Sequence, residues 1–219
     1  MFSRSEEDHI KAIHGLLQDA GQAFTKDIAD RLNTRASSVT DMLKKLAAKG
    51  LVKHAPYHGA TLTAKGRRHA LTLVRKHRLW ETFLVQRLGF AWDEVHEVAE
   101  QLEHVSSEPL IERLDAYLGH PRFDPHGDPI PDRDGRMPER VTVHLSEAQV
   151  GLRHRLVAVK DGSDALLRLL DAKGLAIGRV FTLAARQEFD GSLQLTWRDG
   201  VCDLSAQVAA HLLTVPDHA

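Results

Sequence analysis

The nine residues from His96 to His104 hold an unusual density of side chains that bind metal ions. The stretch is His-Glu-Val-Ala-Glu-Gln-Leu-Glu-His, with two imidazoles and three carboxylates. We expect it to be helical, and residues three or four apart share one side of a helix. His96, Glu100, Glu103 and His104 would then project together, while the valine and leucine side chains between them face the core.

Further ligands occur earlier in the chain. His77 and Glu81 are four residues apart in another helical pattern, so they also share a face. Two helices that carry such groups predict a site for one or two divalent cations. Carboxylates and imidazoles without a neighbouring thiolate favour Mn²⁺ or Fe²⁺, and Zn²⁺ and Co²⁺ can compete for such a site.

Composition narrows the class of protein. The chain has 219 residues, enough for two or three small domains, and its single cysteine, Cys202, excludes an internal disulfide framework and a cysteine-rich zinc module. One cysteine also fits a reducing cytoplasm. No apolar run approaches the ~20 residues that span a bilayer, and the N-terminus lacks a signal-like apolar region, so we expect a cytoplasmic protein without a membrane partner.

The net charge of −1 conceals a strong segregation. Residues 1–80 carry 15 Lys and Arg against 7 Asp and Glu, a net +8, whereas residues 81–140 carry 6 against 14, a net −8. The last 79 residues are nearly neutral, with 8 against 9. A basic first third suggests a polyanion as partner, and an acidic middle suits cations.

The first third predicts a winged helix-turn-helix. Helical patterns begin at about Ser5, Thr25 and Ser37, and two short β-like runs then flank the turn at 56–59. In such a fold the third helix enters the major groove of DNA, and basic groups on helix and wing contact phosphates. The predicted DNA-binding residues are Thr25, Arg35, Ser37, Ser38, Thr40, Asp41, Lys44, Lys45 and His58.

The rest of the chain divides into helices and strands. Helical patterns cover about 63–88, 91–104 and 108–119, and their apolar surface is large enough for a core and for a second copy of the chain. Residues 121–138 contain five prolines and predict an extended linker whose His120, His126 and Asp residues are solvated. Short alternating runs from Val141 onward, with one helix at 164–173, predict a small β-barrel.

Several motifs together resemble the diphtheria toxin repressor and manganese transport regulator family. The resemblance rests on Ser-Glu-Glu-Asp-His-Ile at 5–10, Ser-Ser-Val-Thr at 37–40, Leu-Thr-Ala-Lys-Gly at 62–66 and Arg-Lys-His-Arg-Leu at 75–79. It extends to Val-His-Glu at 95–97, Leu-Glu-His at 102–104 and His-Gly-Asp-Pro-Ile-Pro at 126–131, and thus to nearly the whole chain.

The resemblance implies a mainly α protein with a small β domain. Its parts would be a winged helix-turn-helix domain at 1–65, a helical dimerisation and metal-binding domain at 66–120, a linker at 121–140 and an SH3-like, FeoA-type domain at 141–219. The implied function is that of a dimeric, metal-dependent DNA-binding regulator, most often a repressor, of metal homeostasis, acting on a palindromic operator.

The resemblance also implies a ligand set. Asp8, Glu100, Glu103 and His104 would form the regulatory site, with His77 beside it, and the oxygen pair from Asp8 and Glu100 resembles the manganese branch. A second site would use His77, Glu81 and His96, completed from the C-terminal domain.

Two positions depart from the family pattern. Lys11 stands where short manganese-type members carry a bridging Glu, which argues against a binuclear cluster. Gly162 and Ala165 stand where iron-type members carry Glu and Gln ligands, so Asp161 or Asp164 would have to substitute.

Two other classes of function compete with DNA-binding regulation. A di-metal carboxylate and histidine enzyme would need a Glu-x-x-His motif on each of two helices, and the chain lacks that pair. A metal-storage protein on a helical scaffold would not need the winged helix. Binding to a palindromic promoter fragment, with and without Mn²⁺ or Fe²⁺, separates the three.

Overall fold

The computed structural model describes residues 2–55, 59–160 and 163–217. The chain forms two compact units. The first contains Met1–His77, Glu100–Ile111 and Pro131–Met137, and the second contains Arg78–Ala99, Glu112–Ile130 and Pro138–Ala219. Helix α4 (Ala64–Leu88) contributes residues to both. None of the described helices has the length and apolar character needed to cross a membrane.

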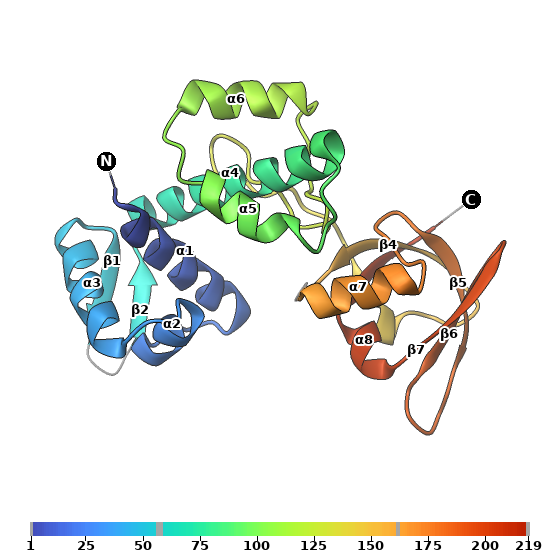
Figure 1. Cartoon of the computed structure of the whole chain (residues 1–219). Coiled ribbons are helices and arrows are strands. Elements are labelled where there is room, and N and C mark those ends of the chain that lie inside the picture. Colours follow the sequence, from blue (N-terminus) through green and yellow to red (C-terminus); the bar gives the residue numbers. More distant parts are fainter. Residues whose placement is uncertain (1, 56–58, 161–162, 218–219) are drawn as a thin grey trace. The chain divides into compact units, whose positions relative to one another are not determined.

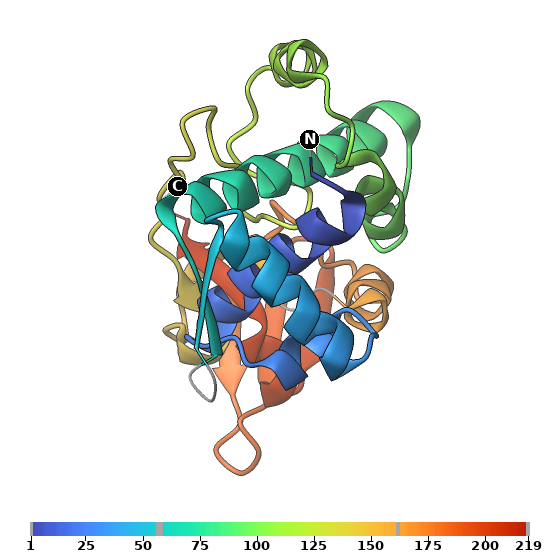
Figure 2. The same ribbon diagram turned by 90° about the vertical axis from the view of Figure 1, so that its left-hand side faces the viewer.

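The first unit contains the predicted winged helix-turn-helix (Figures 1 and 2). Its elements are α1 (Arg4–Asp19), α2 (Thr25–Arg31), α3 (Ala36–Ala48), β1 (Val52–Ala55) and β2 (Gly59–Leu62). The two strands pair antiparallel, with Val52 opposite Leu62. Their shared core is aliphatic, and Ile10, Ile28 and Leu43 are fully buried in it.

A side-chain cap marks the start of α1 but not the start of α2. Ser3 caps α1: its hydroxyl accepts the Glu6 N–H, and the Glu6 carboxylate accepts the Ser3 N–H. Helix α2 begins at Thr25, as its pattern predicts, but Phe24 occupies the cap position without a side-chain hydrogen bond.

The helix predicted over 91–104 is shorter in the structure. Helix α5 covers Val95–Leu102, residues 92–94 form a turn before it, and Glu103 and His104 form a turn after it. Helix α6 follows at Glu108–Tyr117. The prediction that Glu103 and His104 lie on the face of a helix is therefore wrong, although their side chains still point into the first unit.

The C-terminal part of the second unit is a six-stranded antiparallel sheet in the order β3-β8-β4-β5-β6-β7. The strands are β3 (Val143–His144), β4 (Arg153–Val159), β5 (Val180–Arg186), β6 (Leu193–Trp197), β7 (Gly200–Leu204) and β8 (Leu212–Pro216). A short 3₁₀ helix (Leu145–Glu147), α7 (Asp164–Ala172) and α8 (Ala206–Ala210) complete it. Strand β8 and helix α8 were not predicted.

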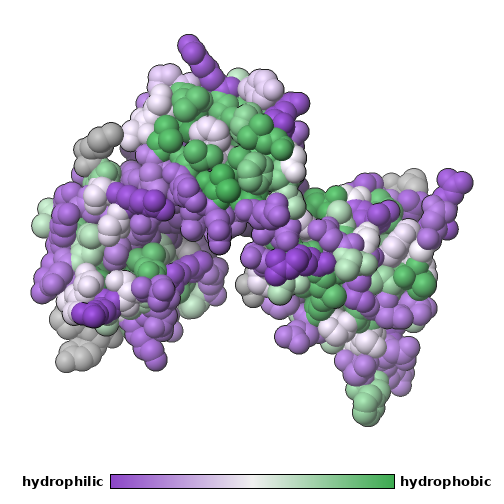
Figure 3. Space-filling model, in the orientation of Figure 1, coloured by the Kyte–Doolittle hydropathy of each residue, from purple (hydrophilic) through white to green (hydrophobic). Residues whose placement is uncertain are grey.

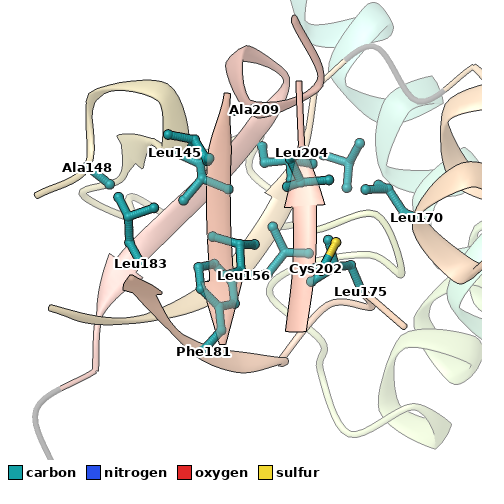
Figure 4. Packing of buried hydrophobic residues seen from close by; sticks show 14 of the residues in the cluster. Leu145, Ala148, Leu156, Leu170, Leu175, Phe181, Leu183, Cys202, Leu204 and Ala209 are labelled. Carbon is teal, nitrogen blue, oxygen red and sulfur yellow. The ribbon is translucent and has the colours of Figure 1, made fainter. Parts of the chain in front are cut away.

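The sheet curves around one apolar core (Figure 4). Irregular pairing between Leu156 and Ala158 and between Leu183 and Ala185 bends β4 and β5. Phe181, Leu183 and Cys202 face inward and are almost inaccessible to water. This arrangement confirms the predicted small β domain.

The proline-rich segment at 121–138 is folded, not extended and solvated. Phe123 and Pro129 pair across a tight turn, and Asp124 accepts the backbone N–H groups of His126 and Asp128. A Cβ on Gly127, where φ is +89°, would lie 2.0 Å from the Val157 carbonyl oxygen, so only glycine fits this turn. Asp124 is buried and His126 half-buried, which corrects the prediction that both are solvated.

The helical part of the second unit exposes apolar and aromatic side chains. Leu88 is 58% exposed and Tyr117 is 61% exposed. Tyr117 packs against Phe83, with ring centroids 6.3 Å apart, and beneath the Arg87 guanidinium. Figure 3 shows apolar side chains gathered over the helices labelled α4 to α6 in Figure 1. An exposed apolar surface of this kind is typical of a contact with another protein molecule.

Candidate metal centre and recognition helix

The first unit brings Asp8, Glu103 and His104 together. One ligand atom from each lies within 4.8 Å of the others. The His104 Nε2 atom lies 3.1 Å from Asp8 Oδ1 and 3.9 Å from Glu103 Oε1. Asp8 comes from α1, within the winged helix, whereas Glu103 and His104 come from the turn after α5. Two carboxylates and an imidazole from separate elements thus meet at one point.

Glu7 orients the His104 ring. Its Oε2 lies 2.7 Å from His104 Nδ1, and its Oε1 lies 3.3 Å from His69 Nε2. With the proton on Nδ1 donated to Glu7, the lone pair of Nε2 faces Asp8 and Glu103. Metal-binding histidines usually have such a carboxylate on their other nitrogen. Glu7 was not predicted, because an acidic residue in the first turn of a helix has a local explanation.

Lys11 and His77 hold the other oxygen of Glu103. Lys11 Nζ lies 2.5 Å and His77 Nδ1 lies 2.6 Å from Glu103 Oε2, and Lys11 is also 3.2 Å from His77 Nδ1. Glu100, half-exposed on α5, is 3.8 Å from the same ammonium group. The structure therefore places His77 and Glu100 at the edge of the cluster, around a lysine.

The charges of this cluster suit a cation. Burial raises the pKa of Asp8, and the charges of Glu103 and Glu100 add to this effect while His104 and Arg4 oppose it. Burial also raises the pKa of Glu103, but the hydrogen bond from His77 and the charge of Lys11 outweigh it, so that pKa is lowered. An oxygen-rich donor set with one imidazole and no thiolate fits a divalent cation such as Mn²⁺.

A second cluster lies within the second unit. Ligand atoms of Glu81, Asp124 and His126 lie within 4.8 Å of one another, and His96 Nδ1 is 3.3 Å from Glu81 Oε1. His126 Nε2 is 2.7 Å from the Trp92 carbonyl oxygen, to which it can donate, so that Nδ1 faces Glu81 at 3.9 Å. This donor set, two buried carboxylates and an imidazole, also fits a divalent cation.

Asp124 and His126 were missed as ligands because their positions have a local explanation. They stand two residues apart in Asp-Pro-His-Gly-Asp, which is typical of a turn. Burial, together with the charges of Glu81 and Asp128, raises the pKa of Asp124 well above its usual range. A carboxyl group so perturbed beside a second carboxylate is a candidate for a functional role.

The predicted second ligand set, His77, Glu81 and His96, has ligand atoms within 4.8 Å of one another. His96 Nδ1 lies 3.3 Å from Glu81 Oε1, and His77 Nδ1 also lies 2.6 Å from Glu103 Oε2. Asp164 is the exposed first residue of α7 and belongs to neither cluster of described residues, and Asp161 lies outside the described residues.

The recognition helix α3 presents small and charged side chains. Arg35 stands at its N-cap, and Ser37, Ser38, Asp41 and Lys44 are exposed. Thr40 donates its hydroxyl to the Ala36 carbonyl, and Thr25 is half-buried at the start of α2. His58 lies outside the described residues. The exposed residues near the start of α3 leave room for close approach of a nucleic-acid backbone.

Ion pairs from one buried carboxylate to two partly exposed lysines join α1 to α3. Glu6 is 1% exposed, and its Oε1 lies 2.5 Å from Lys49 Nζ and 3.1 Å from Lys45 Nζ. The hydrogen bonds from Lys49 and from the Ser3 backbone lower the pKa of Glu6 to about 2. Glu6 stands two residues before Asp8, so the helix that carries a metal-cluster residue is tied directly to the recognition helix.

A winged helix beside a carboxylate and imidazole cluster defines the class of metal-dependent DNA-binding transcription regulators. Three family models match the chain: the iron dependent repressor N-terminal DNA binding domain at residues 1–60, the iron dependent repressor metal binding and dimerisation domain at 63–132, and the FeoA domain at 143–215. The chain belongs to the iron-dependent repressor family.

Individual relatives agree with this assignment. The iron-dependent repressor IdeR of Mycobacterium leprae is 32% identical over 187 residues, which cover 80% of this chain and 81% of that protein. The transcriptional regulator MntR of Lysinibacillus sphaericus is 38% identical over 114 residues, covering 52% of this chain and 81% of that protein.

Solved structures extend the likeness to the whole fold. A manganese-dependent transcriptional repressor in complex with manganese superposes with a TM-score of 0.84 at 38% identity, covering 96% of this chain and 99% of that one. ScaR with bound Zn²⁺ gives 0.74 at 32% identity, covering 96% and 98%. These relatives are regulators, and the alternative of a di-metal enzyme is set aside.

Replacing Glu6 with Gln should weaken metal-dependent DNA binding several-fold and lower the thermal midpoint by a few degrees, because a neutral amide no longer holds Lys45 and Lys49. DNA affinity in Mn²⁺ and calorimetric unfolding measure the two effects. Asp19→Asn is the matched control, since Asp19 is an exposed carboxylate on the same helix that pairs with Arg31. Equal behaviour of the two variants would show that Glu6 does not couple α1 to α3.

Proposed function

We propose that the chain is a Mn²⁺-responsive repressor of metal-homeostasis genes, which acts in the cytoplasm as a homodimer. The observation that carries the proposal is the meeting of Asp8, from the winged helix, with Glu103 and His104 from the turn after α5. Fe²⁺ is the second candidate for the physiological cation, and Zn²⁺, Co²⁺ or Cd²⁺ would act as surrogates.

The residues of the first cluster would hold the cation, and Glu100 is close enough in sequence and position to join them. A bound divalent cation would supply positive charge for Asp8, whose pKa is raised by burial, and would offset its repulsion from the ionised Glu103. Without it, repulsion between these carboxylates loosens the attachment of α1 to the turn after α5. Because Glu6 ties α1 to α3, the position of the recognition helix depends on that attachment.

Lys11 supports one cation in the first cluster rather than two. Its ammonium group already lies against Glu103 and His77 and near Glu100. A second divalent ion there would face a fixed positive charge at short range, which is unfavourable even in a polar environment. The second cation of each chain would instead bind to Glu81, Asp124 and His126, with His96 beside Glu81.

The partner is double-stranded DNA, and the proposed operator is palindromic. A two-fold dimer presents two recognition helices, so half-sites related by the same symmetry are expected about one or more helical turns apart. Leu88, Tyr117 and the neighbouring apolar surface of the helical part would form the dimer contact.

Replacing Glu103 or His104 with Ala should remove the dependence of DNA affinity on Mn²⁺, because each change takes away a ligand from the cluster. The expected loss is about 5–150-fold in saturating Mn²⁺, the usual range of allosteric coupling. Fluorescence anisotropy on a promoter fragment measures it. Glu97→Ala is the control, since Glu97 is exposed on α5. Wild-type Mn²⁺ dependence in both variants would refute the assignment of this cluster.

Replacing Lys44 with Ala should weaken binding to all DNA sequences alike and reduce the slope of log affinity against log salt by about 1, as expected for one lost phosphate contact. Lys45→Ala should do the same and also release Glu6. The control is Lys160→Ala, an exposed lysine of the C-terminal domain. If salt dependence is unchanged in both α3 variants, α3 does not face the DNA backbone.

Replacing Asp124 with Asn should reduce the Mn²⁺ bound per chain by one ion and leave the ion at Asp8, Glu103 and His104 in place. Equilibrium dialysis with elemental analysis counts the ions. Asp128→Asn is a close control, because Asp128 lies in the same turn but pairs with Arg78 and is 48% exposed. An unchanged ion count in the Asp124 variant would remove the second cluster from the proposal.

A further inference from the structure

A hollow of about 810 Å³ opens on the outer face of the C-terminal sheet. It is separate from both metal clusters and lies entirely within the second unit. Its size falls within the ~300–1,000 Å³ that is usual for sites of small molecules. The lining residues are Arg153, Ala176, Ile177, Gly178, Arg179, Val180, Phe181, Thr182, Thr196, Trp197, Arg198 and Asp199.

The strand register builds the floor of the hollow. Arg153 of β4 lies opposite Thr182 of β5, which lies opposite Thr196 of β6. Neighbouring residues such as Phe181 and Leu195 point to the other side of the sheet, into the apolar core. A row of one guanidinium and two hydroxyl groups therefore crosses three strands on the side away from the core.

Trp197 and Arg179 form a fixed wall. The Trp197 indole is half-buried against the core, and a Cβ on Gly200 would lie 2.7 Å from it, so the ring has little room to move towards β7. The Arg179 guanidinium lies 5.5 Å from the centre of that ring, and Arg179 Nε donates to the Gly174 carbonyl at 3.0 Å. The flat face of the Trp197 indole thus lies beside a guanidinium group that a hydrogen bond keeps in place.

The residues around the hollow carry a net positive charge, although the C-terminal domain as a whole is nearly neutral. Residues 141–219 carry 8 Lys and Arg against 9 Asp and Glu, yet the hollow is lined by three arginines and a single acid, Asp199. Among the described residues, neither Arg179 nor Arg198 forms an ion pair. Arginine offers planar, paired donors that match carboxylate and phosphate groups.

One carboxylate of the chain itself is held by arginines beside the hollow. At its edge, the two oxygens of Asp217 accept from Arg153 at 3.0 Å and from Arg155 at 2.5 Å. Arg179 and Arg198 offer the same kind of donor further along the hollow.

We propose that the hollow binds a small anion, with a phosphate or carboxylate group held by Arg179 and Arg198 and a flat or apolar part against Trp197. The hydroxyl groups of Thr182 and Thr196 supply further donors on the floor. A polyanion such as DNA fits less well, because the basic groups gather around one open hollow instead of forming a long stripe. The site gives the sheet domain a ligand of its own, independent of the metal clusters.

The test is a titration of the full chain with inorganic pyrophosphate, citrate and adenosine diphosphate at constant ionic strength. The protein is first stripped of metal, because all three probes chelate divalent cations. NMR follows the indole N–H signals, of which the three tryptophans give one each, and Trp197→Phe identifies the relevant one. We expect a saturable shift of the Trp197 signal with at least one probe. A shift with pyrophosphate alone shows that the hollow prefers a phosphate group, and a shift with citrate alone shows that it prefers a carboxylate. Tighter binding of adenosine diphosphate than of pyrophosphate shows that the adenine ring packs on Trp197.

Arg198→Glu should raise the dissociation constant by about 10-fold or more, the effect of losing a charged hydrogen bond and gaining a repulsive charge. Lys160→Glu makes the same change of charge on an exposed residue outside the hollow and should have no effect. An equal loss of affinity in the Arg198 and Lys160 variants would overturn the proposal, as would shifts of all three indole signals that do not saturate. It is also overturned if a non-specific DNA duplex shifts the Trp197 signal and none of the three small probes does.

Discussion

The carboxylate of Glu103 is almost completely removed from water, and the first unit is arranged around the compensation of its charge. A buried carboxylate costs several kcal/mol unless it is paired and hydrogen-bonded. Lys11 and His77 satisfy one of its oxygens, and the other faces His104. The partners come from α1, from α4 and from the turn after α5, so a single buried charge draws three separate segments to one place.

Three consecutive acidic residues of α1, Glu6, Glu7 and Asp8, connect the surroundings of Glu103 to the rest of the winged helix. Glu6 faces the lysines at the end of α3, Glu7 faces His104 and His69, and Asp8 faces His104. One turn of α1 therefore contacts α3 through Glu6 and both nitrogens of the His104 ring through Glu7 and Asp8. In the proposed mechanism, a change in the charge around Asp8 would reach the recognition helix through α1 alone, because Glu6 and Asp8 belong to the same helix.

Periodicity and turn chemistry were enough to predict the winged helix, the long α4 and most strands of the sheet, because these depend on local patterns. They were not enough for the end of α5, since the apolar period continues to Val105 and only the contacts of Glu103 with distant residues show the break. Asp124 and His126 were missed for a similar reason. Their burial depends on Gly127 packing against Val157, a contact that no local pattern contains.

The run Glu6-Glu7-Asp8 has a consequence for how such a chain can evolve. Successive residues of an α-helix are turned by about 100° about its axis, since each turn has about 3.6 residues. Ser3 fixes where α1 begins, so the direction of each carboxylate depends on its count from that cap. Substitutions in this segment change one contact at a time. A single insertion or deletion between Ser3 and Glu6 would redirect all three carboxylates, so the length of this segment is more constrained than its composition.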